Sequence, residues 1–364
     1  MRSLSRRDRP GFRLSRFAAA ASFVSVAVLG VLASPGISQA NVHVLTGIRT
    51  AQIAAKGLGH GITSAAIGPL PTPTPTVPDP TDSSRAPDRV AQPDLPGLGP
   101  SVGVPVPAGW TSTVEQVQSG VLLRDYVVTR PTITGPGTLP VLLVLHGHGM
   151  TPAGVARITG FLSTVGKAVV VFPAGFGQSW NAGECCGVAR TAGIDDVSFL
   201  TTVVHDVLAS VPGTSAHDVY LAGFSNGGRM AYRMACASPG LFAGVAAVEA
   251  VPVPACEPSR PVSIAIVAYQ NDPYLSIAAP QPIQEVRGID EPRVGDIVAQ
   301  WRQVDGCVGN PTVTTVGTAI NTVWSACQDQ ARVQYTLYAG GGHRWPQGDG
   351  GTPSASSLIW NFLH

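Results

Sequence analysis

The chain has 364 residues, of which 44% are hydrophobic, and it carries a formal net charge of +1. This length is enough for one large domain or two ordinary ones, with a sizeable buried core. The balanced charge, without a basic stripe, argues against nucleic acid as a partner.

Residues 1–40 have the pattern of a secretory signal peptide. Several arginines precede an uncharged apolar run at 17–33, and the small residues Ser38 and Ala40 occupy the positions that a signal peptidase reads. We predict cleavage after Ala40 and a secreted, extracellular protein without stable membrane insertion. An uncleaved membrane anchor is the alternative, because the apolar run approaches the shortest length that spans a bilayer. Cleavage would remove six Arg and one Asp from 23 basic and 22 acidic residues, which leaves a net charge of −4.

Residues 41–107 are predicted to be a low-complexity, Pro-rich N-terminal segment and linker. Proline is concentrated between residues 69 and 107, and such sequences stay extended and solvated instead of packing. For about the last dozen of these residues, a loop wrapped on the following domain is the alternative.

Short apolar runs alternate with segments of helical period in residues 108–364. The apolar runs, most of them rich in β-branched residues, predict buried strands at Val141–Leu145, Ala168–Phe172, Val219–Ala222, Val245–Val248, Val262–Ala268 and Val333–Tyr338. Apolar residues three and four positions apart predict helices at Ile194–Leu208, Gly228–Ala237, Val294–Val304 and Ala355–Phe362. We therefore expect one α/β domain, a mostly parallel sheet with helices on both faces.

A glycine-rich turn between a predicted strand and a predicted helix contains a candidate nucleophile. Residues 221–236 read LAGFSNGGRMAYRMAC, in which Gly223, Ser225 and Gly227 form the G-x-S-x-G pattern of a nucleophile elbow. The glycines leave room for the tight turn that exposes the hydroxyl. We predict that Ser225 is a catalytic nucleophile; the alternative is a serine that only caps the helix.

A serine nucleophile needs a base and an acid that orients the base. His343 lies in a glycine-rich turn, YAGGGHRWPQG, directly after the last predicted strand. Asp272 directly follows another strand, where its carboxylate can accept the imidazole N–H; a turn-forming Asp before a proline is the alternative. We predict His343 as the base and Asp272 as the acid. Four other acids between Ser225 and His343 fit less well, because they fall in a helix or linker: Asp290, Glu291, Asp296 and Asp305.

An oxyanion hole needs two backbone N–H groups aimed at the developing negative charge. We predict that one comes from Asn226, which follows the nucleophile, and the other from His148 in the stretch LLVLHGHGM. His146 is interpreted as a loop-supporting residue, with a metal site shared with His148 as a weaker alternative because no carboxylate stands nearby in sequence. No cofactor and no metal are expected.

The six cysteines are an even number, consistent with disulfides in an exported protein. None shows C-x-x-C spacing, which argues against structural zinc. Six cysteines permit fifteen connectivities, and sequence order favours the pairs Cys236–Cys256 and Cys307–Cys327. This would leave Cys185 and Cys186 to each other, although a bond between neighbours is strained. Each of the first two pairs would close a loop of about twenty residues, worth on the order of 3 kcal/mol.

Several blocks together resemble a known family. LHGHG, WNAGECCG with GIDDVSFL, GFSNGGRMAYRMAC, WRQVDGC and GGGHRWPQG are similar, in that order, to secreted polyhydroxybutyrate depolymerase-like and feruloyl esterase-like α/β-hydrolases. The resemblance spans nearly all of residues 120–364. It implies an α/β-hydrolase fold, carboxylic-ester hydrolysis through an acyl-enzyme, and Ser225, Asp272 and His343 as the triad.

Two blocks depart from the pattern of this family. The relatives usually carry His-Gly-Thr-x-Asp at the acid, whereas residues 268–272 read AYQND and keep only the Asp. The oxyanion loop of relatives usually continues with smaller residues than those at 148–151. These departures affect the loops that shape the substrate pocket more than the chemistry.

We therefore predict a secreted serine esterase for polyhydroxyalkanoate, feruloyl or acetyl esters, small or polymeric. A non-catalytic secreted binding protein on the same scaffold is one alternative, since a fold does not settle a function. A secreted serine peptidase is the other. Retention of all three predicted triad residues favours an enzyme over a binding scaffold.

Overall fold

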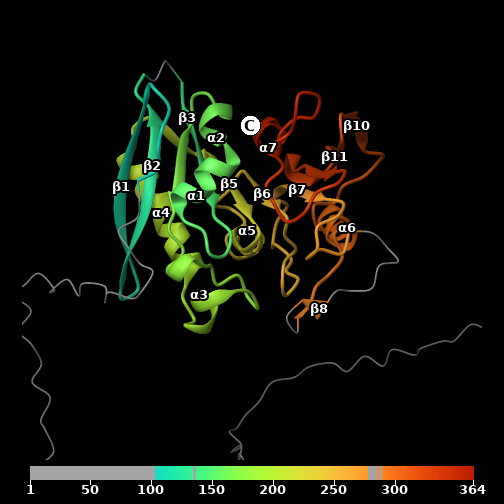
Figure 1. Cartoon of the computed structure of the whole chain (residues 1–364), viewed down its shortest axis with the longest axis horizontal. Coiled ribbons are helices and arrows are strands. Elements are labelled where there is room, and N and C mark those ends of the chain that lie inside the picture. The colour runs from blue at the N-terminus through green and yellow to red at the C-terminus, as the bar shows by residue number, and fades with distance from the viewer. Residues whose placement is uncertain (1–102, 134–136, 278–284, 287–288) are drawn as a thin grey trace, which may run out of the picture. The chain divides into compact units, whose positions relative to one another are not determined.

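A computed structural model describes residues 103–133, 137–277, 285–286 and 289–364 (Figure 1). The predicted signal peptide and residues 41–102 of the predicted linker lie outside the described residues. Val104, near the end of the predicted linker, is buried among apolar side chains of the α/β domain. In the described part of the chain, no helix is long and apolar enough to cross a bilayer.

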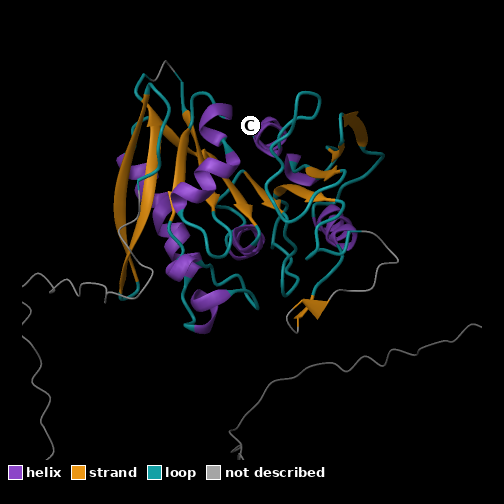
Figure 2. Ribbon diagram, viewed as in Figure 1, coloured by secondary structure: helices purple, strands orange, loops and turns teal. Residues whose placement is uncertain are grey.

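A ten-stranded sheet runs through the domain (Figure 2), in the order β1-β2-β4-β3-β5-β6-β7-β12-β11-β10. Its strands are β1 (Trp110–Ser119), β2 (Leu122–Pro131), β3 (Leu139–Leu145), β4 (Val169–Pro173), β5 (Thr214–Phe224), β6 (Gly244–Val248), β7 (Ser263–Tyr269), β10 (Thr312–Val316), β11 (Ala319–Trp324) and β12 (Val333–Tyr338). The central strands from β4 to β12 pair in parallel, whereas β1, β2, β11 and β10 pair antiparallel. The predicted mostly parallel sheet is confirmed.

Helices cover both faces of the sheet, as predicted. They are α1 (Pro152–Thr159), α2 (Phe161–Thr164), α3 (Gly187–Thr191), α4 (Asp196–Ser210), α5 (Asn226–Ala237), α6 (Val294–Val304) and α7 (Ala355–Leu363). The apolar sides of α4, α5 and α6 belong to one core, and those of α1, α2 and α7 belong to the other. The sheet therefore lies between two helical layers (Figure 1).

The central strands are apolar over most of their buried length because both of their faces are covered. In β3, Val141, Leu143 and Leu145 pack into the core beneath α4 and α5, while Leu142 and Val144 pack into the opposite core. Successive side chains of a strand point to opposite faces, so a strand between two helical layers needs apolar residues at every position. This is why six mostly apolar runs of the sequence predicted these strands.

The strands of the main sheet that the sequence analysis did not predict lie at its two ends, and the helices α1, α2 and α3 were also not predicted. β1 reads WTSTVEQVQS and is largely exposed, and β10, which reads TVTTV, is exposed throughout. A strand with one or both faces in water lacks the continuous apolar run that marks a buried strand. A separate small ladder pairs β8 (Glu285–Val286) with β9 (Ile289–Asp290).

The structure contains the two disulfides that sequence order favoured and the bond that this leaves between Cys185 and Cys186. Cys236–Cys256 ties the last turn of α5 to the segment that follows β6, and Cys307–Cys327 ties the segment after α6 to the segment after β11. Cys185–Cys186 joins two neighbours shortly before α3. All three lie in loops and helix ends outside the sheet.

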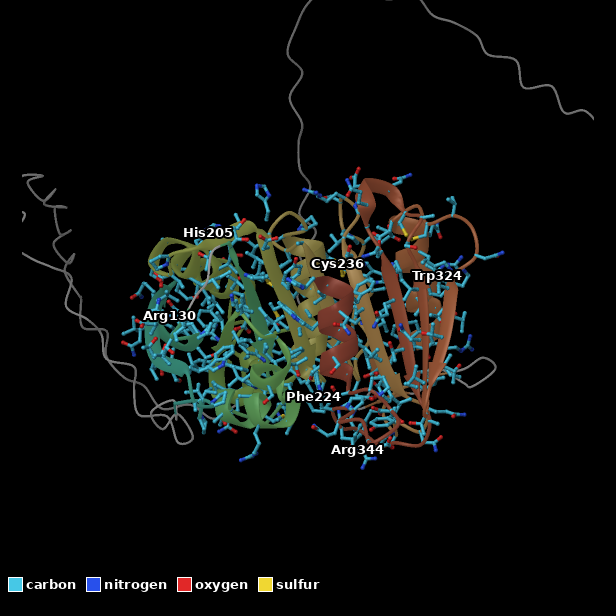
Figure 3. The ribbon with its side chains drawn as sticks, turned by 90° about the horizontal axis from the view of Figure 1, so that it is seen from above. Arg130, His205, Phe224, Cys236, Trp324 and Arg344 are labelled. Atoms are coloured by element: carbon cyan, nitrogen blue, oxygen red, sulfur yellow. A yellow bond between two sulfur atoms is a disulfide. The ribbon has the colours of Figure 1, made fainter. Side chains whose placement is uncertain are left out.

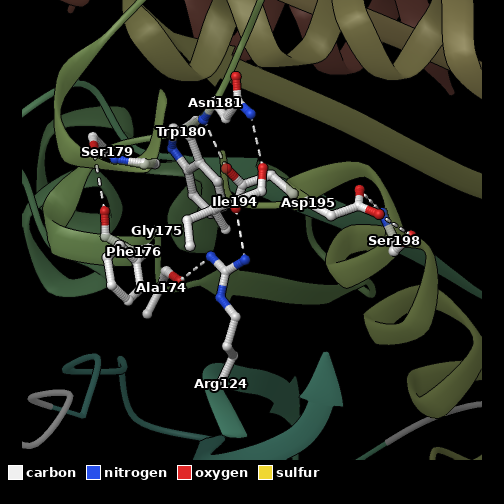
Figure 4. Close-up of polar contacts among 12 residues, drawn as sticks. Arg124, Ala174, Gly175, Phe176, Ser179, Trp180, Asn181, Ile194, Asp195 and Ser198 are labelled. Atoms are coloured by element: carbon white, nitrogen blue, oxygen red, sulfur yellow. Dashed lines mark hydrogen bonds and ion pairs between the residues drawn. The ribbon is translucent and has the colours of Figure 1, made fainter. Parts of the chain in front are cut away.

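A buried ion pair fastens the segment between β4 and α4 to the sheet (Figure 4). Nη1 of Arg124 in β2 lies 2.6 Å from Oδ1 of Asp196, the first residue of α4, and both side chains are almost fully buried. The other carboxylate oxygen of Asp196 accepts the backbone N–H of Asn181, and Nη2 of Arg124 donates to the carbonyl of Ala174. The guanidinium also stacks 3.7 Å from the ring centre of Phe199. One cation therefore fixes both ends of the connection.

We predict that Asp196→Ala destabilises the protein by about 3 to 5 kcal/mol, because it leaves a buried guanidinium without its counterion. Asp195 offers a matched control, since its side chain is exposed and accepts the N–H and the hydroxyl of Ser198 at the start of α4. Asp195→Ala should cost about 1 kcal/mol, as expected for a lost helix cap. Urea unfolding of both variants measures the difference, and equal losses would contradict the prediction.

Candidate active site

The turn from β5 into α5 holds Ser225 in an unusual backbone conformation. Its φ is 53° and its ψ is −118°, a region that non-glycine residues rarely adopt. A Cβ on Gly227 would lie 2.5 Å from the carbonyl oxygens of Leu145 and His146, so only glycine fits there. The backbone of α5 therefore passes directly against the end of β3, and the turn projects Ser225 from the carboxyl end of β5, as a nucleophile elbow does.

Ser225, His343 and Asp272 form one hydrogen-bonded chain. Oγ of Ser225 lies 2.7 Å from Nε2 of His343, and Nδ1 of His343 lies 2.7 Å from Oδ2 of Asp272. An ionised carboxylate only accepts hydrogen bonds, so the ring proton sits on Nδ1 and Nε2 presents its lone pair to the serine hydroxyl. The structure thus brings together the three residues predicted as nucleophile, base and acid.

Asp272 is buried and remains the acidic member of this chain. Burial by itself would raise the pKa of Asp272, but hydrogen bonds with His343 and Glu249, the charge of His343 and the N–H of Tyr274 outweigh it and lower the pKa. The N–H of Tyr274 lies 2.6 Å from Oδ1 of Asp272. The carboxylate is therefore ionised and held at both oxygens.

Aromatic rings flank His343. The ring of Phe224 lies 5.4 Å from the imidazole, and the edge of Tyr274 contacts it at 4.9 Å between ring centres. Phe224 precedes Ser225 and Arg344 follows His343, and both lie on the same side of the molecule in Figure 3, away from Trp324 and His205. The site is therefore at the carboxyl edge of the parallel strands, where such folds assemble their sites.

The side chain of Asn226 has a structural role next to Ser225. Its Oδ1 accepts the N–H of Trp180 at 2.7 Å, and its Nδ2 donates to the carbonyl of the same residue at 3.0 Å. Its backbone N–H is the first of α5, and the geometry of a helix leaves this group without an intrahelical acceptor. The N–H of Asn226 is thus available at the elbow, as the predicted oxyanion hole requires.

His148 and His146 have different environments in the loop after β3. His148 is exposed, and its ring lies against Gly187 at the start of α3. His146 is 1% exposed, its Nε2 accepts the N–H of Gly175, and its Nδ1 faces the carbonyl of Gly147, each at 2.9 Å. Burial lowers the pKa of His146 to about 4, so its ring is neutral. The structure agrees with a loop-supporting His146.

The acids considered as alternatives to Asp272 make other contacts. Glu291 forms a buried ion pair with Arg229 on α5, and Asp305 is buried and accepts the N–H of Val262. Asp296 is exposed and lies 3.8 Å from Arg293. The side chain of Asp290 lies outside the described residues. Among the described side chains, the carboxylate that bonds to the ring of His343 is Asp272.

A cavity of about 390 Å³ lies alongside α5. It is lined by Arg229, Arg233, the Cys236–Cys256 disulfide and the loop at 252–254. Ser225, His343 and Asp272 do not line it. The cavity is therefore separate from the hydrogen-bonded chain and gives no information on the size of a group that could be attached to Ser225.

Comparisons with known proteins place this geometry in context. No family model matches the chain. The chain is 28% identical to "Putative esterase NocK" of Nocardia uniformis subsp. tsuyamanensis over 295 residues, which cover 75% of this chain and 84% of that protein. It is 26% identical to "Probable feruloyl esterase C" of Aspergillus terreus, over 54% of this chain and 65% of that protein.

The chain is similar to feruloyl esterase-like α/β-hydrolases. Its fold is that of the α/β-hydrolases, with the serine elbow after β5, Asp272 after β7 and His343 after β12. Among solved structures, the acetyl xylan esterase from Aspergillus awamori covers 69% of this chain and 98% of its own, with 14% identity and a TM-score of 0.48. The feruloyl esterase module from Clostridium thermocellum has 11% identity and a TM-score of 0.40.

The sequence analysis missed one residue of this α/β-hydrolase site. Glu249 directly follows β6, is 1% exposed, and shares a cluster with Asp272 and His343. The signal was present in the stretch VAAVEAVPVP, where a lone acid stands between apolar residues at the end of a predicted strand. Charged residues are almost never fully buried without a partner, so this acid merited attention.

We predict that His146 makes the protein sensitive to acid. Folding lowers the pKa of His146 from 6.5 to about 4, so the unfolded chain binds a proton in this window that the folded chain does not. Stability is therefore lost as the pH falls from about 6.5 towards 4. Between pH 7 and pH 4.5, His146→Gln should lose about 2 to 3 kcal/mol less unfolding free energy than the wild type.

Urea unfolding at the two pH values measures this difference. His205 provides the control, because it is an exposed histidine. Its replacement tests the loss of a histidine without the loss of a buried one. His205→Gln should follow the wild type at both pH values. An equal loss in wild type and His146→Gln would contradict the assignment of a neutral, buried His146.

Proposed function

We propose that this protein is a secreted serine esterase that hydrolyses carboxylic esters through an acyl-enzyme on Ser225. The observation that carries the proposal is the continuous hydrogen-bonded chain from Oγ of Ser225 through His343 to Asp272, with 2.7 Å at each step. The similarity to an esterase and to a feruloyl esterase supports ester chemistry. The predicted signal peptide and the three disulfides support secretion.

In the acylation step, Nε2 of His343 takes the proton of the Ser225 hydroxyl as Oγ attacks the ester carbonyl carbon. The imidazole then carries a positive charge, which the adjacent carboxylate of Asp272 stabilises. The carbonyl oxygen becomes an oxyanion, for which we propose the backbone N–H groups of Asn226 and His148 as donors. Collapse of this intermediate breaks the ester C–O bond, and His343 returns the proton to the leaving alkoxide.

In the deacylation step, water takes the place of the released alcohol. His343 removes a proton from this water as its oxygen attacks the acyl carbonyl, and the same oxyanion donors stabilise the second intermediate. Breaking the bond to Oγ releases the acid and restores the serine hydroxyl. The cycle needs no cofactor, because acid–base chemistry and covalent catalysis supply every step.

The acyl group is proposed to be a feruloyl, acetyl or hydroxyalkanoyl group. Feruloyl esters have the best support, because one curated relative is named as a feruloyl esterase. The loop that precedes α3 is hydrogen-bonded through Trp180 to Asn226, and the loop that follows β7 contains Asp272, so specificity is expected to reside in these two loops.

Replacement of Ser225 by Ala should abolish ester hydrolysis, with a loss of about 10⁴-fold or more in kcat, because no other group can form the acyl-enzyme. The melting temperature should change little, since the hydroxyl contributes chemistry and little packing. The assay compares acetyl, butyryl, 3-hydroxybutyryl and feruloyl esters with the purified protein. Retained turnover in the variant would contradict the proposal, and turnover of none by the wild type would favour a binding protein or a peptidase.

Asp272→Asn should leave the fold intact and lower kcat by about 10⁴-fold, the magnitude found for this change in serine-protease triads. An asparagine cannot hold His343 in the tautomer that presents Nε2 to the serine. Asp296→Asn is the control, because Asp296 is exposed and its carboxylate pairs with Arg293 instead of with Ser225, Asp272 or His343. A variant at Asp272 within a few-fold of wild type would show that another group orients the base.

A further inference from the structure

Glu249 is a buried acid in a backbone conformation that is unfavourable for a residue other than glycine. It directly follows β6, its side chain is 1% exposed, and its φ is +50°, in the left-handed region that L-residues avoid. Its N–H donates to the carbonyl of Val267 in β7 at 2.9 Å, which keeps the backbone in this conformation. Burial of a carboxyl group in a strained conformation occurs where the surroundings impose it, and such positions are concentrated at functional sites.

The side chain of Glu249 lies next to Asp272 and His343. Its Oε1 accepts the N–H of Tyr269, the last residue of β7, at 2.8 Å. One carboxyl oxygen of Glu249 lies within 4.8 Å of both a carboxylate oxygen of Asp272 and a ring nitrogen of His343. The carboxyl groups of Glu249 and Asp272 therefore lie close together, and each shifts the pKa of the other.

A hydrogen bond between two carboxyl groups requires a proton on one of them, because an ionised carboxylate has no donor. Asp272 already accepts the N–H of Tyr274 and faces Nδ1 of His343, and both contacts favour its ionised form. Oε2 of Glu249 is buried and, among the described residues, receives no hydrogen bond. The proton therefore belongs on Oε2 of Glu249.

Electrostatics agree with this assignment. Burial, the hydrogen bond to Asp272 and the charge of Asp272 raise the pKa of Glu249 to about 11, while the pKa of Asp272 is lowered. Tyr335 of β12 also faces Glu249, and the buried Arg229–Glu291 pair lies within electrostatic reach of Asp272 and His343. Two adjacent carboxyl groups cannot both be ionised at low cost, so the better hydrogen-bonded one keeps the charge.

We propose that Glu249, in its protonated form, is a positioning residue that donates its Oε2–H to Asp272 and holds that carboxylate in line with His343. The donor of this hydrogen bond comes from β6 and its acceptor follows β7, so it ties together two neighbouring strand ends behind the base. The inference rests on the proposed function, in which Asp272 orients His343. Glu249 touches no reacting atom and acts through Asp272.

Glu249, Asp272 and His343 are also close enough together to hold a metal ion. Both ring nitrogens of His343 are already engaged, Nδ1 by Asp272 and Nε2 by Ser225. A metal ligand needs a free lone pair on the ring, so the hydrogen-bonded chain and a metal site exclude each other. The protonated carboxyl group accounts for the same geometry without an ion.

Two substitutions test the donor. Glu249→Gln keeps an oxygen for the N–H of Tyr269 and an N–H for Asp272, so kcat should stay within about threefold of wild type. Glu249→Met keeps the length but removes the donor, so kcat should fall by about tenfold or more with little change in KM. In Glu249→Met, the downfield proton resonance of His343 Nδ1–H should shift or broaden. Asp305→Asn, which changes another buried carboxyl group, should leave activity and resonance unchanged.

A pH titration of stability tests the protonation state without using activity. The unfolded chain releases the Glu249 proton near pH 4.5 and the folded chain near 11, so this group makes the wild type less stable as the pH rises between these values. Glu249→Gln lacks this loss, so its unfolding free energy relative to wild type should increase steadily from pH 5 to pH 9. A difference that is constant with pH would overturn the proposal.

Two further outcomes would also overturn it. Glu249→Gln that folds but is as inactive as Glu249→Met would mean that a charged carboxylate is required. Glu249→Met with a lower melting temperature but wild-type kcat, pH profile and Nδ1–H resonance would mean a structural role only. Failure of the esterase proposal is recognised separately, because it appears as turnover retained by Ser225→Ala, whereas the resonance and the stability titration do not depend on turnover.

Discussion

The close contact of backbone with backbone at the turn between β5 and α5 is the constraint on which the rest of the site depends. Gly227 lies so near the carbonyl groups of Leu145 and His146 that a methyl group would not fit between them. This contact fixes the distance between the helix that begins after Ser225 and the loop that follows β3. The proposed nucleophile and the proposed oxyanion donors are therefore positioned by a single steric condition of the backbone.

The electrostatics of the site depend on which of its buried titratable side chains are neutral and which are ionised. His146 is kept neutral by burial, and the same effect keeps the proton on Glu249. Asp272, with hydrogen bonds at both of its oxygens, is the group of this cluster that bears a negative charge. The negative charge of Asp272, whose Oδ2 lies 2.7 Å from Nδ1 of His343, can therefore stabilise a positive ring during reaction.

The sequence predicted the centre of the sheet better than its edges. The runs VLLVL and AVVVF are apolar because both faces of their strands are buried, and such runs predict strands. β1 and β10 face water, so their sequences mix polar and apolar residues and give no such signal. Ser225, Asp272 and His343 were recognisable because each follows a strand in a turn, and the structure brings them into contact, while their catalytic roles stay predictions. Glu249 was not recognised, because its importance depends on a neighbouring strand that sequence spacing does not reveal.

The edge strand β10 of the ten-stranded sheet is open to pairing with another polypeptide chain. β10 reads TVTTV, pairs only with β11 among the described strands, and carries no charged side chain, with Val313 and Val316 exposed. Edge strands usually discourage further pairing with a charge, a proline or a bulge. Pro311 lies just before β10, but the strand itself has none of these, so its outer backbone groups are open to hydrogen bonds from an extended segment of another molecule. Pairing of another chain along this edge is therefore not opposed by any charge on these five residues.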